Sequence, residues 1–373
     1  MAETRLAKLH DQGQSIWIDL LSRDLVHSGE LKRLIDEDSV TGLTSNPSIF
    51  QKAISGGGAY DTQIRELLEE TDDPRVIFAA LAVDDVRDAC DVFRPVWEAT
   101  GGLDGFVSLE VDPGLAANTR GTFEQAVDLH GRVDRPNLYV KIPATKEGLP
   151  AIEDCIAQGI PINITLIFSL ERYTNVVSAY LRGLARLIAD GGDPSKVSSV
   201  ASFFVSRIDT ETDNRLAKLG NADLQGKLGI ANAKLAYKHF EEAFSGPIWE
   251  RMADQGASKQ RPLWASTSTK NPAYRDVMYV EELIGKDTVN TMPVETVEAF
   301  GDHGEVRGDT VREGVAEAEQ LLLDLAEAGV DYDDVVGTLE TEGVQKFADA
   351  FDELIAGIAA RRGELATQSP GIA

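Results

Sequence analysis

A lysine inside a strand-like apolar run is the residue with the clearest chemical potential. Lys141 lies between Val140 and Ile142 in the stretch LYVKIPATKEG, residues 138–148. An ammonium group among apolar side chains costs free energy unless the group is used or reaches water. One interpretation is a strand-end charge that reaches solvent. The other is a partly desolvated amine that loses its proton and attacks a carbonyl group.

Further polar side chains interrupt other apolar runs, mostly toward their C-terminal ends. They are Asp19, Glu110, Asn163, Thr165, Ser202, Ser266 and Ser268. Asn163 and Thr165 are two residues apart, so they share one face of a strand. Ser266 and Ser268 are in phase in the same way. A lysine, two carboxylates, an amide and hydroxyls on successive strands predict a site.

This set of groups suits Schiff-base chemistry. A free amine adds to a ketone, and the resulting iminium accepts the electrons of an adjacent C–C bond as that bond breaks. One base must take a proton from a substrate hydroxyl, and one acid/base must serve imine formation; Asp19 and Glu110 suit these two tasks. Structural roles also stay open for these residues. Asp19 could cap the turn that follows it, and Glu110 could form an ion pair with Lys141. The buried hydroxyl groups could satisfy backbone groups, as such hydroxyls often do.

Eight short runs rich in β-branched and aromatic residues predict strands. They cover residues 15–21, 40–45, 105–111, 138–144, 162–168, 197–205, 262–268 and 288–294. Helical patterns alternate with these runs, and the apolar VIFAALAV at 76–83 is expected to be helical as well. The alternation predicts an α/β fold, a (β/α)8 barrel of the TIM type. Catalytic groups of such barrels lie at the C-terminal ends of the strands.

The chain has 373 residues, more than the ~250 that such a barrel needs. We expect one domain over 1–373, with helical insertions at about 52–72 and 211–256 and a helical C-terminal extension at about 300–365. The stretch 28–38 is expected to form a helix capped by its first residue, Ser28.

Composition narrows the function classes. Lys and Arg number 36 against 62 Asp and Glu, giving a net charge of −26, which repels nucleic acids and anionic membranes. The two cysteines and five histidines show no metal-ligand spacing, so we expect neither a metal nor another cofactor. The N-terminus lacks a signal-peptide core, and no run is long enough to span a membrane. These features predict a cytoplasmic protein.

Two stretches make the chain similar to a known family. GLTSNPSIF at 42–50 and YVKIPATKEGLPAI at 139–152 closely resemble the two transaldolase signatures. Further stretches match in order, namely IDLLSRD, SLEVDPGLA, INITLIFSLERY, SFFVSRIDT and LWASTSTKNP. The resemblance runs from about 15 to 300. It implies a class I aldolase barrel of the longer bacterial kind that moves a dihydroxyacetone unit from sedoheptulose 7-phosphate to glyceraldehyde 3-phosphate. The products would be erythrose 4-phosphate and fructose 6-phosphate, in the non-oxidative pentose phosphate pathway.

The resemblance also implies a role for each matching residue. Lys141 would be the Schiff-base nucleophile, Asp19 the acid/base at the C4 hydroxyl, and Glu110 with Thr165 and a water the proton carriers of imine formation. The dihydroxyacetone unit would be held by Asn46, Asn163 and Ser202. The phosphate would be bound by Arg207 and Ser266. We expect phosphosugar substrates and a monomer or homodimer.

One departure concerns the loop after the seventh strand. Many family members have Ser-Phe-Arg there, whereas this chain has ASTSTKN, in which Lys270 is the only cation. We assign phosphate binding to Lys270, although a lysine cannot form the bidentate contact of an arginine. Two alternatives stay open: a fructose 6-phosphate aldolase that releases free dihydroxyacetone, and a catalytically silent sugar-phosphate-binding barrel. The chain length and Glu110 favour transfer over release, and the presence of Lys141 with both carboxylates argues against a silent barrel.

Overall fold

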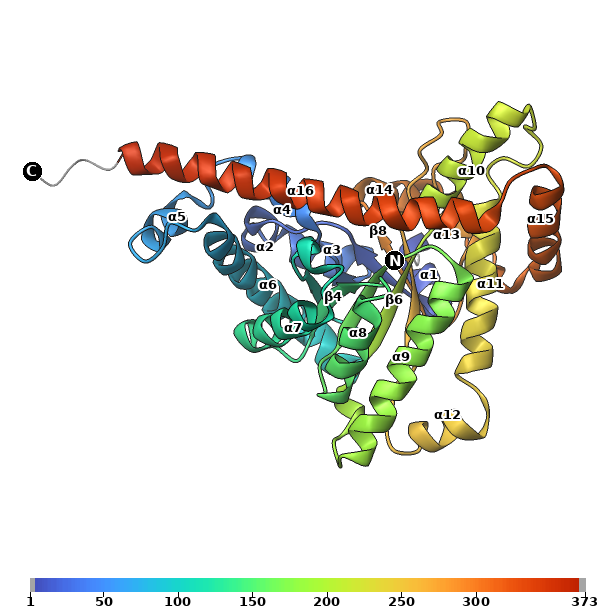
Figure 1. Cartoon of the computed structure of the whole chain (residues 1–373), viewed down its shortest axis with the longest axis horizontal. Helices are drawn as coiled ribbons and strands as arrows, with labels where there is room; N and C mark the ends of the chain where they lie inside the picture. Colours follow the sequence, from blue (N-terminus) through green and yellow to red (C-terminus); the bar gives the residue numbers. More distant parts are fainter. Residues whose placement is uncertain (1–3, 369–373) are drawn as a thin grey trace, which may run out of the picture.

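The computed structural model describes residues 4–368, and its centre is a closed barrel of eight parallel strands (Figure 1). The strands pair in chain order, and β8 closes the barrel against β1. They are β1 (Gln14–Ile18), β2 (Val40–Leu43), β3 (Val107–Glu110), β4 (Leu138–Pro143), β5 (Ile162–Ile167), β6 (Ser199–Phe204), β7 (Arg261–Ala265) and β8 (Thr288–Met292). This confirms the predicted barrel and all eight predicted strands.

Burial on both faces explains why the strands are visible in the sequence. Their residues are buried throughout, except that Glu110 at the end of β3 is partly exposed as a whole residue while its side chain is only 6% exposed. A strand that contacts helices on one face and the barrel interior on the other has no solvent side, so it is a nearly continuous apolar run. Gly42 of β2 marks one tight approach, since a Cβ there would lie 2.5 Å from the indole ring of Trp17.

Helices cover the outside of the barrel and extend the chain beyond it. They are α1 (Arg5–Asp11), α2 (Arg23–His27), α3 (Glu30–Asp38), α4 (Pro47–Ser55), α5 (Asp61–Leu67), α6 (Pro74–Ala99), α7 (Thr119–Val133), α8 (Gly148–Ala157), α9 (Leu170–Ala189), α10 (Ser206–Leu219), α11 (Leu228–Ala243), α12 (Gly246–Ala253), α13 (Met278–Glu282), α14 (Val294–His303), α15 (Val315–Glu327) and α16 (Tyr332–Gln368). Short 3-10 turns cover η1 (Pro113–Leu115), η2 (Pro194–Lys196) and η3 (Thr310–Arg312).

Two local predictions have different outcomes. The apolar stretch at 76–83 is helical, within α6, and Pro74 occupies the first turn, where a missing N–H costs little. The predicted Ser28 cap is wrong, because α3 begins at Glu30 with Gly29 as its cap residue. The φ of Gly29 is 88°, a left-handed conformation that glycine adopts without strain. The Ser28 hydroxyl still accepts the Glu30 N–H, at 3.3 Å.

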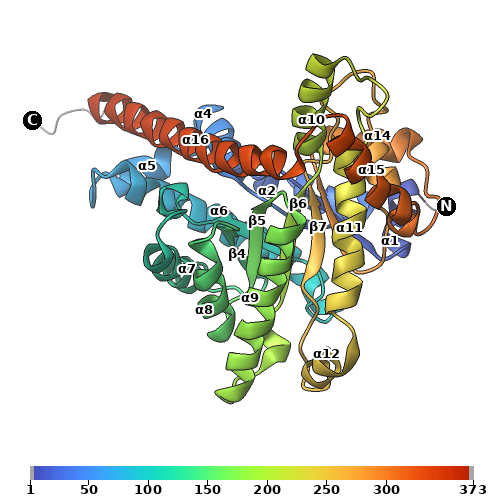
Figure 2. The ribbon, with the colours of Figure 1, turned by 45° about the vertical axis from the view of Figure 1, so that its right-hand side comes forward.

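The longest helix, α16, runs across one end of the molecule (Figure 1, red), and the turned view in Figure 2 shows the same arrangement. It contacts α4, α6, α10 and β5, so it bridges opposite sides of the barrel mouth. Arg172 of α9 forms an ion pair with Glu340 of α16 at 3.0 Å, and Phe351 of α16 packs edge-on against Phe78 of α6. None of the helices described within residues 4–368 has the length and apolar character to cross a membrane.

Candidate active site

A cavity of about 280 Å³ opens at the carboxyl end of the strands. Eight of the ten residues predicted for the site line it, namely Asp19, Asn46, Lys141, Thr165, Ser202, Arg207, Ser266 and Lys270. The other two, Glu110 and Asn163, do not line it. Both are strand neighbours of Lys141, which is in register with Glu110 on one side and Asn163 on the other. Parallel pairing therefore brings these three side chains to one level of the barrel.

Lys141 is enclosed by protein. Only 5% of the residue is exposed, so its amine does not extend into bulk solvent as a strand-end charge would. Its Nζ donates a hydrogen bond to the carbonyl oxygen of Ser45 at 3.2 Å. It also lies 3.7 Å from Oε2 of Glu110 and 5.7 Å from the ring centre of Phe347. Lys141 also lines the cavity, so its side chain faces the space where a substrate could bind.

Glu110 is a carboxyl group that titrates near neutral pH. Burial raises its pKa to about 7, against an opposing effect of Lys141, while the charge of Asp19 adds to the increase. Its Oε2 has no hydrogen-bond partner among the described residues, and neither has Oγ1 of Thr165. A group with this pKa can both give and take a proton at physiological pH.

Asp19 follows β1 and contacts the loop after β2. Its carboxylate accepts hydrogen bonds from the hydroxyl of Thr44 at 2.7 Å and from the amide of Asn46 at 3.4 Å. The cap of the next helix, α2, is Ser22 and not Asp19. Asn46 in turn caps α4 by accepting the Ile49 N–H. Asp19 is therefore held by side chains at the cavity and is free of the turn-capping task that the sequence left open.

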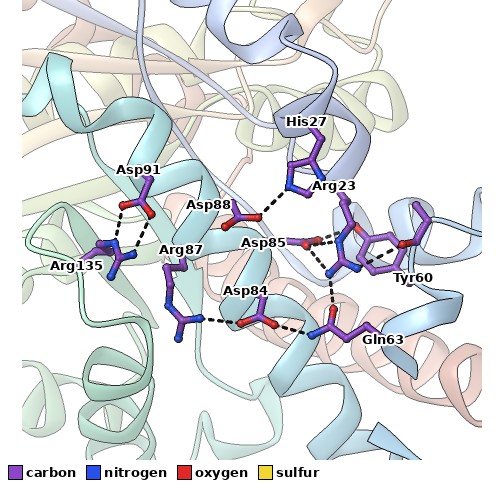
Figure 3. Close-up of polar contacts among 11 residues, drawn as sticks. Arg23, His27, Tyr60, Gln63, Asp84, Asp85, Arg87, Asp88, Asp91 and Arg135 are labelled. Carbon is purple, nitrogen blue, oxygen red and sulfur yellow. Dashed lines mark hydrogen bonds and ion pairs between the residues drawn. The ribbon is translucent and has the colours of Figure 1, made fainter. Parts of the chain in front are cut away.

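The segment after Asp19 is anchored by part of the polar network drawn in Figure 3, around the buried side chain of Asp85. Arg23 at the start of α2 contacts the carboxylate of Asp85 of α6 at 2.8 Å. Tyr60 donates to the same carboxylate at 2.7 Å and lies under the guanidinium group of Arg23. Gln63 of α5 accepts from Arg23 and donates to Asp84. These contacts fix α2, and with it the end of β1, against α5 and α6.

Asn163 lies behind the cavity wall. It is fully buried, accepts from the Ser202 hydroxyl at 2.7 Å, and donates to the Ser108 hydroxyl at 3.0 Å. The geometry brings Ser202 to the cavity surface and leaves Asn163 as the partner that orients it. A direct contact of Asn163 with substrate therefore stays a prediction.

The other end of the cavity is cationic. Burial lowers the pKa of Arg207 at the start of α10, and its Nη1 has no hydrogen-bond partner among the described residues. Burial, with repulsion from Arg207, also lowers the pKa of Lys270, whose amine donates to the Ser268 hydroxyl at 2.7 Å. Ser266, at a left-handed φ of 58°, shares a hydrogen bond with Ser206 at 2.8 Å. Two cations and hydroxyls facing one space suit an anionic group.

Some lining residues were not predicted. Thr44, Ser48 and Thr291 lie within or beside stretches that the sequence singled out, so their positions could have been inferred. Phe204 at the end of β6 looked like an ordinary strand residue. Nothing in the sequence indicated that Phe347 of α16 lines the cavity, because a helical pattern does not show which part of the barrel the helix crosses. Among residues 4–368, no group of three or more His, Cys, Asp or Glu is arranged to hold a metal ion.

A parallel eight-stranded barrel whose cavity brings together a buried lysine, a carboxylate and two cations is typical of α/β-barrel enzymes. Comparison with known proteins identifies the family. The chain belongs to the transaldolase/fructose-6-phosphate aldolase family, whose profile matches residues 16–358. It is 53% identical over 355 residues to a transaldolase of Acidothermus cellulolyticus, covering 95% of each chain. It is 51% identical to transaldolases of Parafrankia sp. (97% and 99% covered) and Mycobacterium ulcerans (94% and 95%).

Proposed function

We propose that the protein is a transaldolase that moves a dihydroxyacetone unit between phosphorylated sugars. The donor is sedoheptulose 7-phosphate and the acceptor glyceraldehyde 3-phosphate; the products are erythrose 4-phosphate and fructose 6-phosphate, as in the non-oxidative pentose phosphate pathway. The observation that carries this is the enclosed Lys141, 3.7 Å from a Glu110 carboxyl whose pKa is about 7, in a cavity with Arg207 at its other end.

Imine formation uses Lys141 and Glu110. The free amine of Lys141 adds to the C2 carbonyl of the donor and forms a carbinolamine. Glu110 then protonates the departing hydroxyl group through a water that also contacts Thr165, and water leaves as the iminium forms. The neutral-range pKa of Glu110 supports this task, because the same carboxyl must give a proton here and take one back when the imine is hydrolysed.

Bond cleavage uses Asp19. Its carboxylate takes the proton of the C4 hydroxyl, the C3–C4 bond breaks, and its electrons form the C2=C3 bond of an enamine on Lys141. The shortened aldose leaves. The enamine then attacks the aldehyde carbon of the acceptor, Asp19 returns the proton to the new C4 oxygen, and hydrolysis frees the product. Asn46, Ser202 and, through Ser202, Asn163 hold the three-carbon unit meanwhile.

The phosphate group meets Arg207, Ser266 and Lys270. Local cations are needed, because a net charge of −26 repels a dianionic substrate on average. Arg207 offers an unpaired Nη1, and Lys270 supplies the charge that this chain has in place of an arginine after β7. We further propose that the chain acts as one domain in the cytoplasm, as a monomer or homodimer.

The test is reductive trapping with fructose 6-phosphate and borohydride, followed by mass analysis of peptides. A stable adduct of the three-carbon or six-carbon unit on the peptide that holds Lys141 is expected, and its absence from Lys141→Met is the control. Adduct on another lysine, or none, would overturn the assignment. Adding an aldose phosphate acceptor separates the two family activities. Transfer consumes the acceptor, whereas an aldolase releases free dihydroxyacetone whether or not the acceptor is present.

A further inference from the structure

A phenylalanine of the C-terminal helix faces the candidate active site. Phe347 of α16 lines the cavity, although it lies 206 positions after Lys141 in the chain. Its ring centre is 5.7 Å from Nζ of Lys141 and 5.9 Å from the guanidinium carbon of Arg207. One aromatic ring thus contacts both the reacting end and the anion-binding end of the cavity.

We propose that Phe347 is a positioning residue that decides between transfer and release of the three-carbon unit, by holding the nitrogen of Lys141 against its ring and by limiting access of water to the intermediate. This inference rests on the proposed function, since it concerns the intermediate held on Lys141. A ring within about 6 Å of a cation attracts it through the ring quadrupole, most strongly where water is excluded. Lys141 is in such a place, with 5% of its surface exposed.

The helix holds the ring in a fixed place. On one side of Phe347, Gly343 packs so closely that a Cβ would lie 3.2 Å from the ring of Phe168. On the other side, Phe351 packs against Phe78 of α6 with ring centres 5.5 Å apart. Tyr332 at the start of the helix donates to Asn232 at 2.7 Å, and Arg361 near its end forms an ion pair with Asp61 at 2.5 Å. Contacts along the whole helix therefore set the position of Phe347.

Release and transfer compete at one intermediate. After the C3–C4 bond breaks, the enamine on Lys141 either attacks the acceptor aldehyde or takes a proton at C3. In the second case a water gives its proton to C3, and the hydroxide left behind adds to C2 of the resulting iminium. The proton of this new hydroxyl group then moves to the nitrogen, and the C2–N bond breaks as the ketone forms. The products are free dihydroxyacetone and the Lys141 amine. A ring over the nitrogen that occupies the space water would need slows this second route.

The experiment compares single substitutions in the full chain. Phe347→Leu removes the aromatic ring and keeps an apolar side chain, while Phe347→Tyr keeps the ring. Phe351→Leu is the control for helix position, because it makes the same change one turn further along α16, at a ring that packs against Phe78 but does not line the cavity; the remaining contacts of α16 are expected to hold the helix in place. For each variant, free dihydroxyacetone and transferred product are measured from fructose 6-phosphate with an aldose phosphate acceptor present. Trapping with borohydride is measured in parallel.

Phe347→Leu is expected to raise the ratio of release to transfer by about tenfold, equivalent to about 1.4 kcal/mol between the competing steps. Phe347→Tyr and Phe351→Leu are expected to stay within about twofold of the wild-type ratio. An unchanged ratio in Phe347→Leu, or an equal rise in Phe351→Leu or Phe347→Tyr, would overturn the inference. A failure of the proposed function looks different, since the wild-type protein would then give no borohydride adduct on Lys141.

Discussion

Oε2 of Glu110 lies 3.7 Å from Nζ of Lys141, beyond hydrogen-bond distance and well within the range of strong electrostatic coupling. The two residues are direct neighbours in the register of β3 and β4. Burial nevertheless dominates, and the pKa of Glu110 is raised to about 7 in spite of the lysine. Near neutral pH, both the protonated and the ionised form of this carboxyl group are therefore populated, beside the amine that we propose as the nucleophile.

The raised pKa predicts a pH dependence of stability. The pKa of Glu110 is higher in the folded chain than the ordinary 4.5, so its contribution to folding is present below about pH 4.5 and is lost as pH rises through about 7. Glu110→Gln cannot titrate. Between pH 5 and 8, its free energy of unfolding is expected to gain about 2–3 kcal/mol relative to the wild-type protein. Urea unfolding of both proteins at pH 5 and pH 8 measures this difference. An equal change in unfolding free energy for the two proteins would contradict the prediction.

Replacing the nucleophile is expected to stop the reaction and spare the fold. Lys141→Met keeps the aliphatic stem and removes the amine, so transfer should fall by roughly 10⁴-fold or more. The far-UV circular dichroism spectrum should stay unchanged, because Glu110 can protonate once its cationic neighbour is gone. Near-normal transfer by this variant would show that another group carries the chemistry.

A chelator is expected to leave transfer unchanged. The iminium on Lys141 accepts electrons in place of a metal ion, and the described residues form no metal-binding cluster. Dialysis against a strong chelator, followed by assay with and without added divalent ions, checks this. Activity that is lost on dialysis and restored by one ion would refute it.

The sequence revealed the barrel because its strands are buried on both faces. In such strands a polar residue is conspicuous, which is how Lys141, Glu110 and Asn163 could be assigned to a site toward the C-terminal ends of the strands. The strand register then shows that they lie at one level. The same reasoning could not tell which of them reach the cavity. Asn163 does not, because the Ser202 hydroxyl stands between it and the open space.

Phe347 and Ser28 show the limits of the sequence. The periodicity of α16 predicts a helix but not its path across the barrel mouth, which depends on partners such as Arg172 and Phe78 far away in the chain. Ser28 is a good cap by residue type, yet Gly29 takes that position because the chain needs a left-handed turn between α2 and α3. Tertiary contacts determine the path of α16, and backbone conformation determines the cap of α3. The local sequence predicts neither of these outcomes.

The network behind Asp19 offers a matched pair of substitutions on α6. The side chain of Asp85 is 1% exposed and pairs with Arg23, whereas that of Asp88 is 47% exposed and pairs with His27. Asp85→Asn removes the buried charge that pairs with Arg23 and accepts a hydrogen bond from Tyr60, and it is expected to cost about 3 kcal/mol of unfolding free energy. Asp88→Asn is expected to cost less than about 1 kcal/mol. Chemical denaturation of both variants tests this, and equal losses would contradict the assigned role of burial.

Substitutions at the cationic end test the phosphate site. A charge-assisted hydrogen bond to a partly enclosed phosphate contributes about 1.5–3 kcal/mol, so Arg207→Ala should weaken apparent substrate affinity by roughly ten- to a hundredfold. Lys270→Ala should have a smaller effect, because an ammonium acts as a single point charge. Lys196→Ala is the control, since Lys196 is the last residue of η2, is exposed, and lies outside the cavity.

The comparison of donors separates phosphate binding from structural support. With a donor that lacks the phosphate group, the losses caused by Arg207→Ala and Lys270→Ala should nearly disappear, because the bond that each variant removes is absent from the wild-type reaction as well. Steady-state kinetics with both donor types for all three variants measure this. If Arg207→Ala loses as much with the non-phosphorylated donor, then the guanidinium group supports the cavity wall through Phe204 and Phe347, and the phosphate binds elsewhere.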